Sequence, residues 1–329
     1  MRRRTLISRC IGTALTLALR GTGALAQARG KVYRLGFLTS GGAALGLFGD
    51  AIKRELASRG YRIDNELVIE TRSAEGDPRR LPGLVKELAA LPVDLILSFS
   101  YPAALAAKES AGDVPVVVVG SGDPVGTGLV ASLARPGGHI TGISDVAAEL
   151  APKRLELLKA AAPALRKVAM LWNADDVGMT LRYRASAAAA ATLGVTVQSL
   201  GVREPEDFEQ AFAAMDREPP DGILMVSDAL TFLNRGRVFD YTIAHRLPAI
   251  YEIEAWVRAG GLMSYGPDGR EVAERTAALI ERILKGAKPA DLPFEQPTRF
   301  RFVINLKTAK ALGLAIPESV VERADDVIE

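Results

Sequence analysis

The 329-residue chain contains one cysteine, Cys10, and two histidines, His139 and His245. Cys10 lies in the first 26 residues, so a mature chain beginning after Ala26 has no thiol, no disulfide and only packing to stabilise it. The two histidines match no metal-ligand spacing. We therefore predict a protein without metal or cofactor.

Sequence motifs of common enzymes are also absent. The chain has neither a G-x-S-x-G nucleophile motif nor a G-x-x-x-x-G-K-[ST] phosphate loop. The Gly-rich segment 120–126 is one residue too long for a dinucleotide fingerprint, and it follows the fourth predicted strand instead of the first. We predict that the protein is not an enzyme. The alternative is an unconventional carboxylate site using Asp123 and Asp228.

The sequence also has no large excess of positive or negative side chains. The chain has 41 basic and 39 acidic side chains, but residues 1–26 contain five arginines and no acid, which leaves 36 basic and 39 acidic side chains in the remainder. A slightly acidic body argues against nucleic acid as a partner, because phosphate binding needs a basic surface.

Residues 1–26 have the pattern of a secretory signal peptide. Arg2, Arg3 and Arg4 form a positive start, residues 11–19 are apolar, and residues 24–26 read Ala-Leu-Ala. The apolar stretch is too short to span a bilayer. We predict cleavage near Ala26 and a periplasmic product, with the general and twin-arginine export routes both open. The alternative is an amphipathic N-terminal helix of a cytoplasmic protein.

Short apolar runs alternate with helical stretches, which is typical of parallel sheets with crossover helices. The two halves repeat this order at offsets of 134, 128 and 133 residues between matched strand centres. The sequence therefore predicts an α/β protein of two similar, doubly wound parallel-sheet lobes. The predicted strands are 32–38, 67–70, 94–98, 116–119 and 140–143, then 168–172, 195–198, 222–226, 249–251 and 261–265.

The C-terminal part predicts two further crossings between the lobes. An amphipathic helix at 271–285 is expected to pack on the first lobe, and the Pro-rich segment 287–297 leads back to a strand at 300–305 and helices at 308–312 and 317–328. The N-terminal lobe is then 30–145 with 270–292, and the C-terminal lobe is 146–269 with 293–329. Three connecting segments form a hinge that bends but resists twisting.

Ligands of open parallel sheets bind beyond the carboxyl ends of the strands, where helix N-termini present unpaired N–H groups. The N–H groups of residues 101–104 are candidates to hold a carboxylate, Asp123 and Asp228 an ammonium, and Tyr101, Trp172 and Tyr251 an apolar wall. The full set of candidates is Ser40, Ser98, Ser100, Tyr101, Asp123, Trp172, Asn173, Asp228 and Tyr251. Structural alternatives are a helix cap for Ser100 or Asp228, a turn before Pro124 for Asp123 and core packing for Trp172.

Several stretches resemble one known family. They include Gly-Asp-Pro-Val-Gly-Thr-Gly-Leu-Val at 122–130, Lys-Arg-Leu-Glu-Leu-Leu-Lys at 153–159, and Ala-Gly-Gly-Leu-Met-Ser-Tyr-Gly at 259–266. With 133–138, 247–251 and 304–310 they make residues 31–329 similar to substrate-binding proteins of ABC importers of the tryptophan/tyrosine-transport type.

The resemblance implies a type I periplasmic-binding-protein fold, capture of a small amino-acid-like or aromatic carboxylate ligand by lobe closure, and delivery to an inner-membrane permease. A monomer is the default for a diffusing solute carrier. The family usually has Gly-Thr-Pro-Ala-Ala where residues 100–104 read Ser-Tyr-Pro-Ala-Ala, so the ring of Tyr101 is expected to reshape the pocket. The alternative function is a ligand-sensing module for a receptor or kinase.

Overall fold

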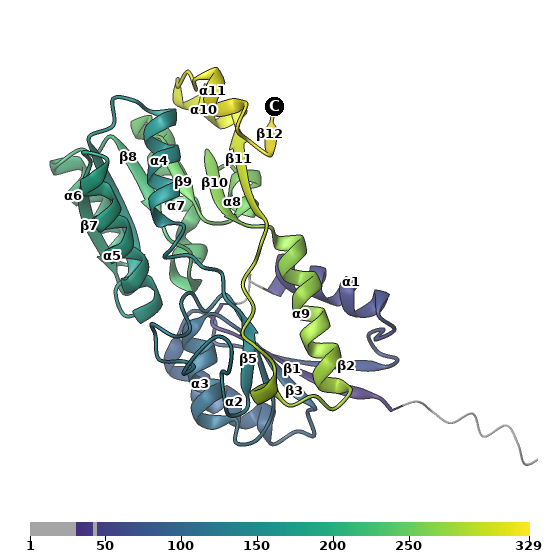
Figure 1. The fold of residues 1–329 in the computed structure, drawn as a ribbon. Helices are drawn as coiled ribbons and strands as arrows, with labels where there is room; N and C mark the ends of the chain where they lie inside the picture. The colour runs from purple at the N-terminus through teal and green to yellow at the C-terminus, as the bar shows by residue number, and fades with distance from the viewer. Residues whose placement is uncertain (1–30, 42–44) are drawn as a thin grey trace, which may run out of the picture. The chain divides into compact units, whose positions relative to one another are not determined.

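The computed structural model describes residues 31–41 and 45–329 (Figure 1). The predicted signal peptide and Cys10 lie outside these residues. The body from Tyr33 to Glu329 forms one compact unit that contains two sheets. Among the described residues, no helix has the length and apolarity needed to cross a membrane.

The first sheet has five parallel strands in the order β2-β1-β3-β4-β5. Its strands are β1 (Tyr33–Thr39), β2 (Leu67–Ser73), β3 (Leu95–Phe99), β4 (Val116–Val119) and β5 (Ile140–Ile143). Parallel strands buried on both faces are continuously apolar, and all four residues of β4 are valines. This run accounts for the agreement between the predicted and observed strand.

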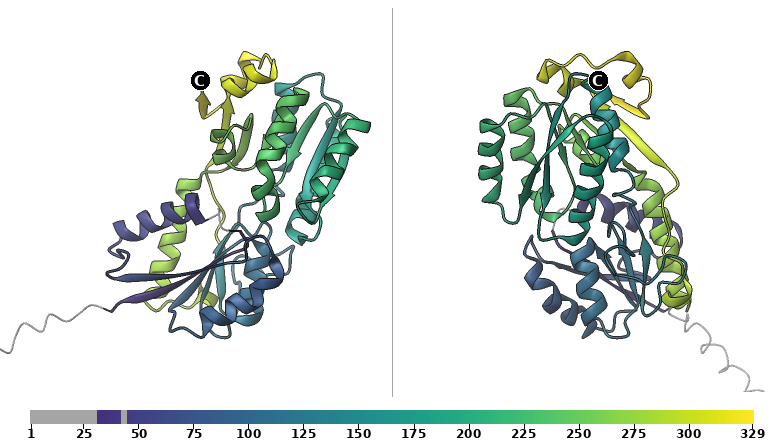
Figure 2. Two further views of the ribbon diagram at one scale, coloured as in Figure 1. Left: turned by 180° about the vertical axis from the view of Figure 1, so that it is seen from behind. Right: turned by 60° about the vertical axis from the view of Figure 1, so that its left-hand side comes forward.

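Helices cover both faces of this sheet (Figure 2). One face packs on α1 (Asp50–Ser58) and α9 (Gly269–Leu284), whose Ala277 and Ile280 join the cluster around Phe37. The other face packs on α2 (Leu81–Ala89) and α3 (Tyr101–Ser110). The prediction that the helix near 271–285 packs on the first lobe is therefore confirmed. Short helices η1 (Leu45–Gly49), η2 (Pro78–Arg80) and η3 (Pro289–Asp291) lie in connections.

The second sheet repeats the strand order of the first and extends it. Its order is β12-β11-β10-β9-β8-β6-β7, so β7-β6-β8-β9-β10 corresponds to β2-β1-β3-β4-β5. The internal repeat predicted from the offsets is confirmed. These strands are β6 (Lys167–Asn173), β7 (Thr196–Val202), β8 (Gly222–Met225), β9 (Ala249–Tyr251), β10 (Met263–Pro267), β11 (Phe300–Asn305) and β12 (Asp326–Ile328).

Two clusters form the second lobe's core, one on each face of this sheet. One contains residues of α4 (Ala151–Ala161), α5 (Val177–Thr192) and α10 (Leu306–Leu312), and the other contains residues of α6 (Asp207–Arg217), α7 (Ala229–His245) and α8 (Glu254–Arg258). The two sheets with their helices are the two lobes, whose boundaries in the chain stay a prediction.

The C-terminal end departs from the prediction of a helix at 317–328. Only α11 (Glu318–Val321) is helical, and β12 follows it, pairing in parallel with β11 through Ile304 and Val327. Asp325 stabilises the start of this pairing, because its carboxylate accepts a 2.7 Å hydrogen bond from the Phe302 N–H in β11. β11 itself runs antiparallel to β10. Strand pairing thus satisfies backbone groups that a C-terminal helix would leave at the sheet edge.

Candidate ligand-binding site

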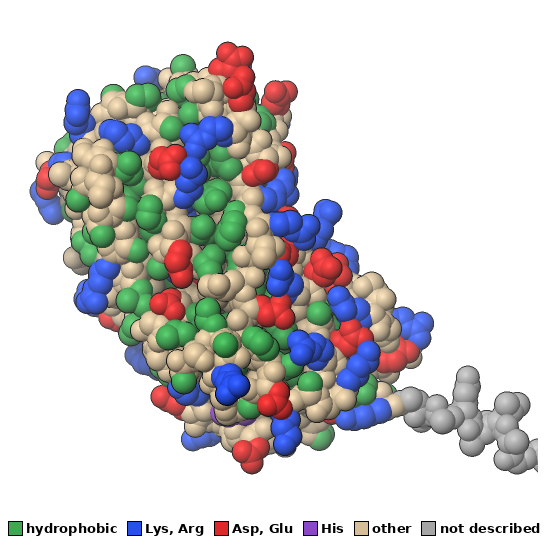
Figure 3. Space-filling model, in the orientation of Figure 1, with side chains coloured by type: hydrophobic (Ala, Val, Ile, Leu, Met, Phe, Trp, Pro, Cys, Tyr) green, Lys and Arg blue, Asp and Glu red, His purple; other side chains and the backbone are tan. Residues whose placement is uncertain are grey.

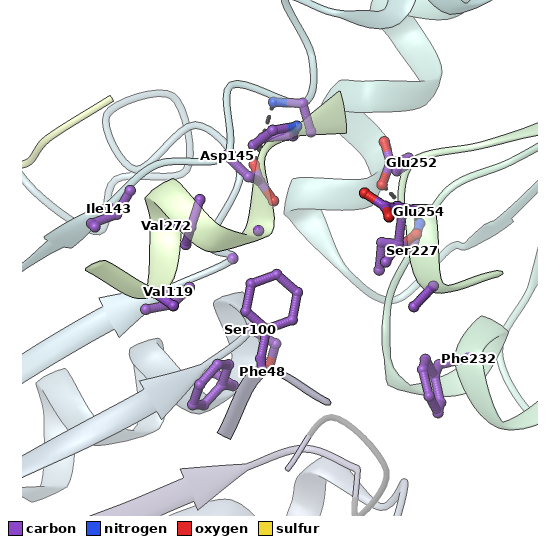
Figure 4. A pocket seen from close by; sticks show the side chains of 18 of the residues that line it. Phe48, Ser100, Val119, Ile143, Asp145, Ser227, Phe232, Glu252, Glu254 and Val272 are labelled. Carbon is purple, nitrogen blue, oxygen red and sulfur yellow. Dashed lines mark hydrogen bonds between the residues drawn. The ribbon is translucent and has the colours of Figure 1, made fainter. Parts of the chain in front are cut away.

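A cavity of about 540 Å³ is lined by residues of both lobes (Figure 4). The first lobe supplies the ends of β1, β3, β4 and β5, and the second lobe supplies the ends of β8, β9 and β10. This is the carboxyl edge of both sheets, where ligands of doubly wound folds bind. The volume falls in the range of small-molecule sites, about 300–1,000 Å³.

The wall from the first lobe is mainly apolar. Phe48 of η1, Phe99 at the end of β3 and Val272 of α9 face the cavity, beside Val119 and Ile143 from the next two strands. Phe99 is held in place by Phe37, whose ring centroid lies 5.0 Å away. Two phenylalanine rings on one wall provide an apolar surface suited to a flat or aromatic group.

Ser40 and Ser100 add hydroxyl groups to this wall. Their side-chain oxygens are 2.7 Å apart, within hydrogen-bond distance. Ser100 occupies the N-cap position of α3 as predicted, but its side chain makes no capping hydrogen bond. Its backbone has φ +83° and ψ 158°, a conformation that residues other than glycine rarely adopt. In this conformation the Ser100 hydroxyl pairs with Ser40 and leaves the start of α3 uncapped by that side chain.

The wall from the second lobe is more polar. Ser227, Asp228 and Ala229 follow β8, and residues 252–255 follow β9. Asp228 caps α7, because its Oδ1 accepts a 2.8 Å hydrogen bond from the Thr231 N–H. Phe232 of α7 is the aromatic group of this wall.

Behind Phe232 lies a buried tryptophan. The ring of Trp256 in α8 meets Phe232 edge to face, with centroids 6.1 Å apart. Trp256 is 1% exposed. The aromatic wall of the second lobe is therefore backed by a second ring that does not itself line the cavity.

Four charged side chains form a network at the cavity, and all but Asp145 are buried. Glu252 lies between two arginines, with its Oε1 2.8 Å from Arg154 Nη1 and its Oε2 2.6 Å from Arg182 Nη1. Arg182 Nη2 also pairs with Asp145, which follows β5, at 2.8 Å. The arginine side chains are at most 3% exposed. This network connects α4, α5, the end of β9 and the first connection between the sheets.

Burial opposes the charge of both arginines, but neighbouring carboxylates compensate for it to different extents. Desolvation lowers the pKa of Arg154, and the Glu252 charge offsets this only in part. Burial also opposes the charge of Arg182, but Asp145 and Glu252 together raise the pKa of Arg182. Arg154 is therefore the less compensated cation.

A buried carboxyl group lies next to this network. Asp176 caps α5, and its Oδ1 accepts hydrogen bonds from the N–H groups of Gly178 and Met179 at 2.7 and 3.3 Å. Burial, with a smaller contribution from the negative charge of Asp228, raises the pKa of Asp176 to about 6. Asp176 does not line the cavity.

Of the nine predicted site residues, Ser40, Ser100 and Asp228 line this cavity. The other three from the first lobe lie elsewhere. Ser98 is fully buried within β3, the Tyr101 hydroxyl donates to the Thr127 carbonyl at 3.3 Å, and the Asp123 carboxylate accepts from the N–H groups of residues 125 and 126. Asp123 thus has the turn geometry that a residue before Pro124 favours.

The remaining three candidates from the second lobe also lie outside the cavity lining. Trp172 stacks on Tyr183 with ring centroids 4.8 Å apart, and Tyr251 is completely buried in the core beside Trp256. Asn173 reaches the site indirectly, since its side-chain amide donates a 2.6 Å hydrogen bond to Asp228 Oδ2. The end of β6, unlike that of β1, does not line the cavity.

Sequence reasoning missed Arg154, Arg182 and Phe48. Arg154 stands in the stretch 153–159 that carried the family resemblance, and an arginine on the buried face of an amphipathic helix is the available signal. Arg182 and Phe48 have no comparable signal. Within the described part of the chain, no group of three or more His, Cys, Asp or Glu side chains is arranged to hold a metal ion.

The chain is similar to one curated protein and to solved structures over most of its length. The curated Tyrosine-binding protein of Clostridioides difficile (strain R20291) is 26% identical over 261 residues, 79% of this chain and 75% of that protein. The crystal structure of an ABC domain in complex with L-Trp from Streptococcus pneumonia is 29% identical, with a TM-score of 0.83 over 91% of this chain and 100% of that one. A conserved domain protein from Vibrio cholerae has 23% identity and a TM-score of 0.85, covering 90% of this chain and 100% of its own.

The fold is that of type I periplasmic binding proteins, with two parallel-sheet lobes. The family model for ABC transporter substrate binding proteins matches residues 41–328. This family consists of solute-binding proteins and not of enzymes. The chain belongs to the family of ABC transporter substrate-binding proteins.

Proposed function

We propose that this protein is the extracytoplasmic solute-binding component of an ABC importer and that its ligand is an aromatic amino acid. The observation that carries the proposal is the cavity between the strand ends of the two lobes, with aromatic rings on both walls. The relatives named for tyrosine and found with L-Trp have ligands of this class.

The charges around the cavity favour a ligand without net charge. Five arginines and five carboxylates line it, so the site as a whole is balanced, as suits a zwitterion. These residues are Arg54, Arg154, Arg182, Arg258 and Arg270, and Glu55, Asp145, Asp228, Glu252 and Glu254. Of the two aspartates predicted to bind an ammonium, Asp228 lines the cavity, and we keep it in that role.

The ligand is held by closure of the lobes around it. A ligand shifts such an equilibrium only through tighter contact with the closed form, so both walls have to contribute. The close approach of the lobes supports this: a methyl group placed on Gly41 of the first lobe would lie 3.2 Å from the Ala229 Cβ of the second. The hinge comprises the connections near residues 145, 269 and 293, as the predicted lobe boundaries require.

Export, docking on an inner-membrane permease and a monomeric state complete the proposal. The signal-peptide pattern of residues 1–26 supports a periplasmic location. Membership in a transporter family favours transport over the sensor alternative. On the face in Figure 3, basic and acidic side chains are interspersed, without the single-sign patch that nucleic acid binding needs.

Calorimetry with the purified, refolded protein tests the proposal. L-Tryptophan, L-tyrosine and L-phenylalanine are titrated, with L-leucine and a sugar alcohol as controls, and small-angle scattering follows the radius of gyration. We expect saturable binding of at least one aromatic amino acid and a smaller radius at saturation. No binding of any of the three contradicts the ligand class, and an unchanged radius contradicts closure.

A further inference from the structure

On second-lobe residues that line the cavity, three buried hydrogen-bond donors have no partner among the described residues. They are Arg154 Nη2, Arg182 Nε and Ser227 Oγ. All three residues line the cavity, and the two arginine residues are 1% and 2% exposed. Buried donors in folded proteins almost always have an acceptor, because an unpaired one costs free energy. Glu252 Oε1 also makes no hydrogen bond, but this one oxygen, 2.8 Å from Arg154 Nη1, cannot serve all three donors. Donors at this wall are therefore left for an acceptor that the chain does not supply.

The three donors belong to one cluster. Glu252 Oε2 accepts from both Arg182 Nη1, at 2.6 Å, and the Ser227 N–H, at 2.9 Å, which brings these two residues together. Glu252 Oε1 lies 2.8 Å from Arg154 Nη1. The carboxylate of Glu252 thus holds both guanidinium groups and Ser227 next to each other. Figure 4 shows Glu252 and Ser227 side by side at the cavity.

The remaining groups of the two arginines are already engaged. Arg154 donates from Nε to the Tyr265 carbonyl and from Nη1 to the Ala147 carbonyl, both at 2.8 Å. Arg182 donates from Nη2 to Asp145. These contacts fix both side chains, so the unpartnered donors cannot turn to other protein acceptors without breaking existing bonds.

Among its described residues, the first-lobe wall offers no buried donor of this kind to an anion. Its two lining arginines, Arg54 and Arg270, are both exposed to solvent. The hydroxyls of Ser40 and Ser100 are paired with each other at 2.7 Å. Guanidinium groups are also the side chains best suited to carboxylate, since they combine charge with several N–H donors. The incomplete charge compensation of Arg154, whose pKa burial lowers, points the same way.

Building on the proposed function, we propose that the ligand's carboxylate binds to the second lobe, at Arg154 Nη2, Arg182 Nε and Ser227 Oγ. Its ammonium then reaches the neighbouring Asp228, and its aromatic side chain extends toward Phe48 and Phe99 on the first lobe. This orientation differs from the sequence-based expectation, which placed the carboxylate at the N-terminus of α3. Ser227, Arg154 and Arg182 become the residues that select for a free carboxylate.

Matched serine variants on the two walls test the orientation. Calorimetry compares L-tryptophan with L-tryptophanamide, and L-tyrosine with L-tyrosinamide, in the wild-type protein, Ser227→Ala and Ser40→Ala. We expect each amide to bind the wild-type protein about tenfold to a hundredfold more weakly than its acid, because hydrogen bonds to a charged group are lost. This penalty should shrink about threefold or more in Ser227→Ala and stay unchanged in Ser40→Ala.

A penalty that shrinks in Ser40→Ala and not in Ser227→Ala overturns the inference. So does a penalty that is equal in Ser227→Ala and the wild-type protein. Amides that bind the wild-type protein as tightly as the acids overturn it without affecting the proposed function. If neither acid binds, the proposed function fails and this inference fails with it. Arg154→Lys should also reduce the penalty, provided that circular dichroism confirms its fold; if it does not fold, Ser227→Ala decides.

Discussion

The two lobes have the same strand order but line the cavity with different chemistry. The first lobe contributes the ends of four strands, with phenylalanine rings and two hydroxyls that satisfy each other. The second contributes the ends of three strands and a buried network of arginines and carboxylates. The repeat therefore determines where the walls lie, while individual side chains make the first wall mainly apolar and give the second its buried ionic network.

The largest difference between the walls should appear in stability. Glu252→Ala leaves Arg154 and Arg182 buried with one carboxylate fewer, which we expect to lower the free energy of unfolding by about 3–5 kcal/mol. Ser40→Ala on the first wall removes one neutral hydrogen bond and should cost about 1 kcal/mol. Urea unfolding measures both.

Glu156→Ala is the control for Glu252→Ala, because it removes a glutamate whose side chain is 48% exposed and pairs with Lys153. Its effect should stay within about 1 kcal/mol. A Glu252→Ala protein as stable as this control would contradict the assigned role of the network.

A second difference should appear as pH dependence next to the ionic wall. Asp176 has a folded-state pKa of about 6 against an ordinary 3.8, so the folded protein binds this proton more tightly than the unfolded chain. The unfolding free energy contributed by this group is greatest below pH 4, falls by about 3 kcal/mol as the pH rises from 4 to 6, and is constant above that.

Asp176→Asn removes this pH-dependent fall in the free energy of unfolding and keeps a capping oxygen. The stability of the variant relative to the wild-type protein should therefore increase as the pH rises to 7. Urea unfolding at pH 4, 5, 6 and 7 measures the difference. Asp268→Asn, at the less buried N-cap of α9, is the control. A constant difference between Asp176→Asn and the wild-type protein across this range would contradict the raised pKa.

The aromatic surface of the first wall should matter for affinity. Phe48→Ala removes a ring that lines the cavity and should weaken binding of an aromatic amino acid about tenfold or more. Trp172→Ala removes a larger ring that stacks on Tyr183 outside the cavity lining, and binding should change less than twofold. Calorimetry with L-tryptophan and L-tyrosine compares the two variants, and a larger loss in Trp172→Ala would reverse the assignment.

The smallest predicted effect separates the two aspartates. Asp228→Asn retains a capping side chain on α7 but loses the charge facing the cavity, so L-tryptophan should bind about tenfold more weakly. Asp123→Asn alters a turn away from the cavity lining and should leave the affinity unchanged. Equal affinities for both variants would remove Asp228 from the site.

The strands were predictable where their pattern is local. Both valine-rich β4 and the repeat offsets identify sheet strands without knowledge of their partners. The C-terminal strand β12 was not predictable in this way, because Val327 is a strand residue only through its pairing with Ile304. A segment of three residues is too short for its own propensity to decide, even with Val and Ile, so its long-range partner determines its structure.

The site was partly predictable for a similar reason. Ser40, Ser100 and Asp228 follow strands, so the rule of strand ends finds them. The same rule selected Trp172, which lies at the end of a strand that does not reach the cavity. Arg182 and Glu252 are 70 residues apart, and only the folded chain brings them within 2.6 Å.

Because Trp256 contacts the cavity-lining ring of Phe232, we expect its fluorescence to change when a ligand enters the cavity. The chain has two tryptophans, and the other one, Trp172, does not line the cavity. In a Trp172→Phe background, excitation at the red edge of indole absorption isolates one emitter, so L-tyrosine entry can be timed by stopped flow without an attached dye. The kinetics of capture and release thereby become measurable on otherwise unlabelled protein.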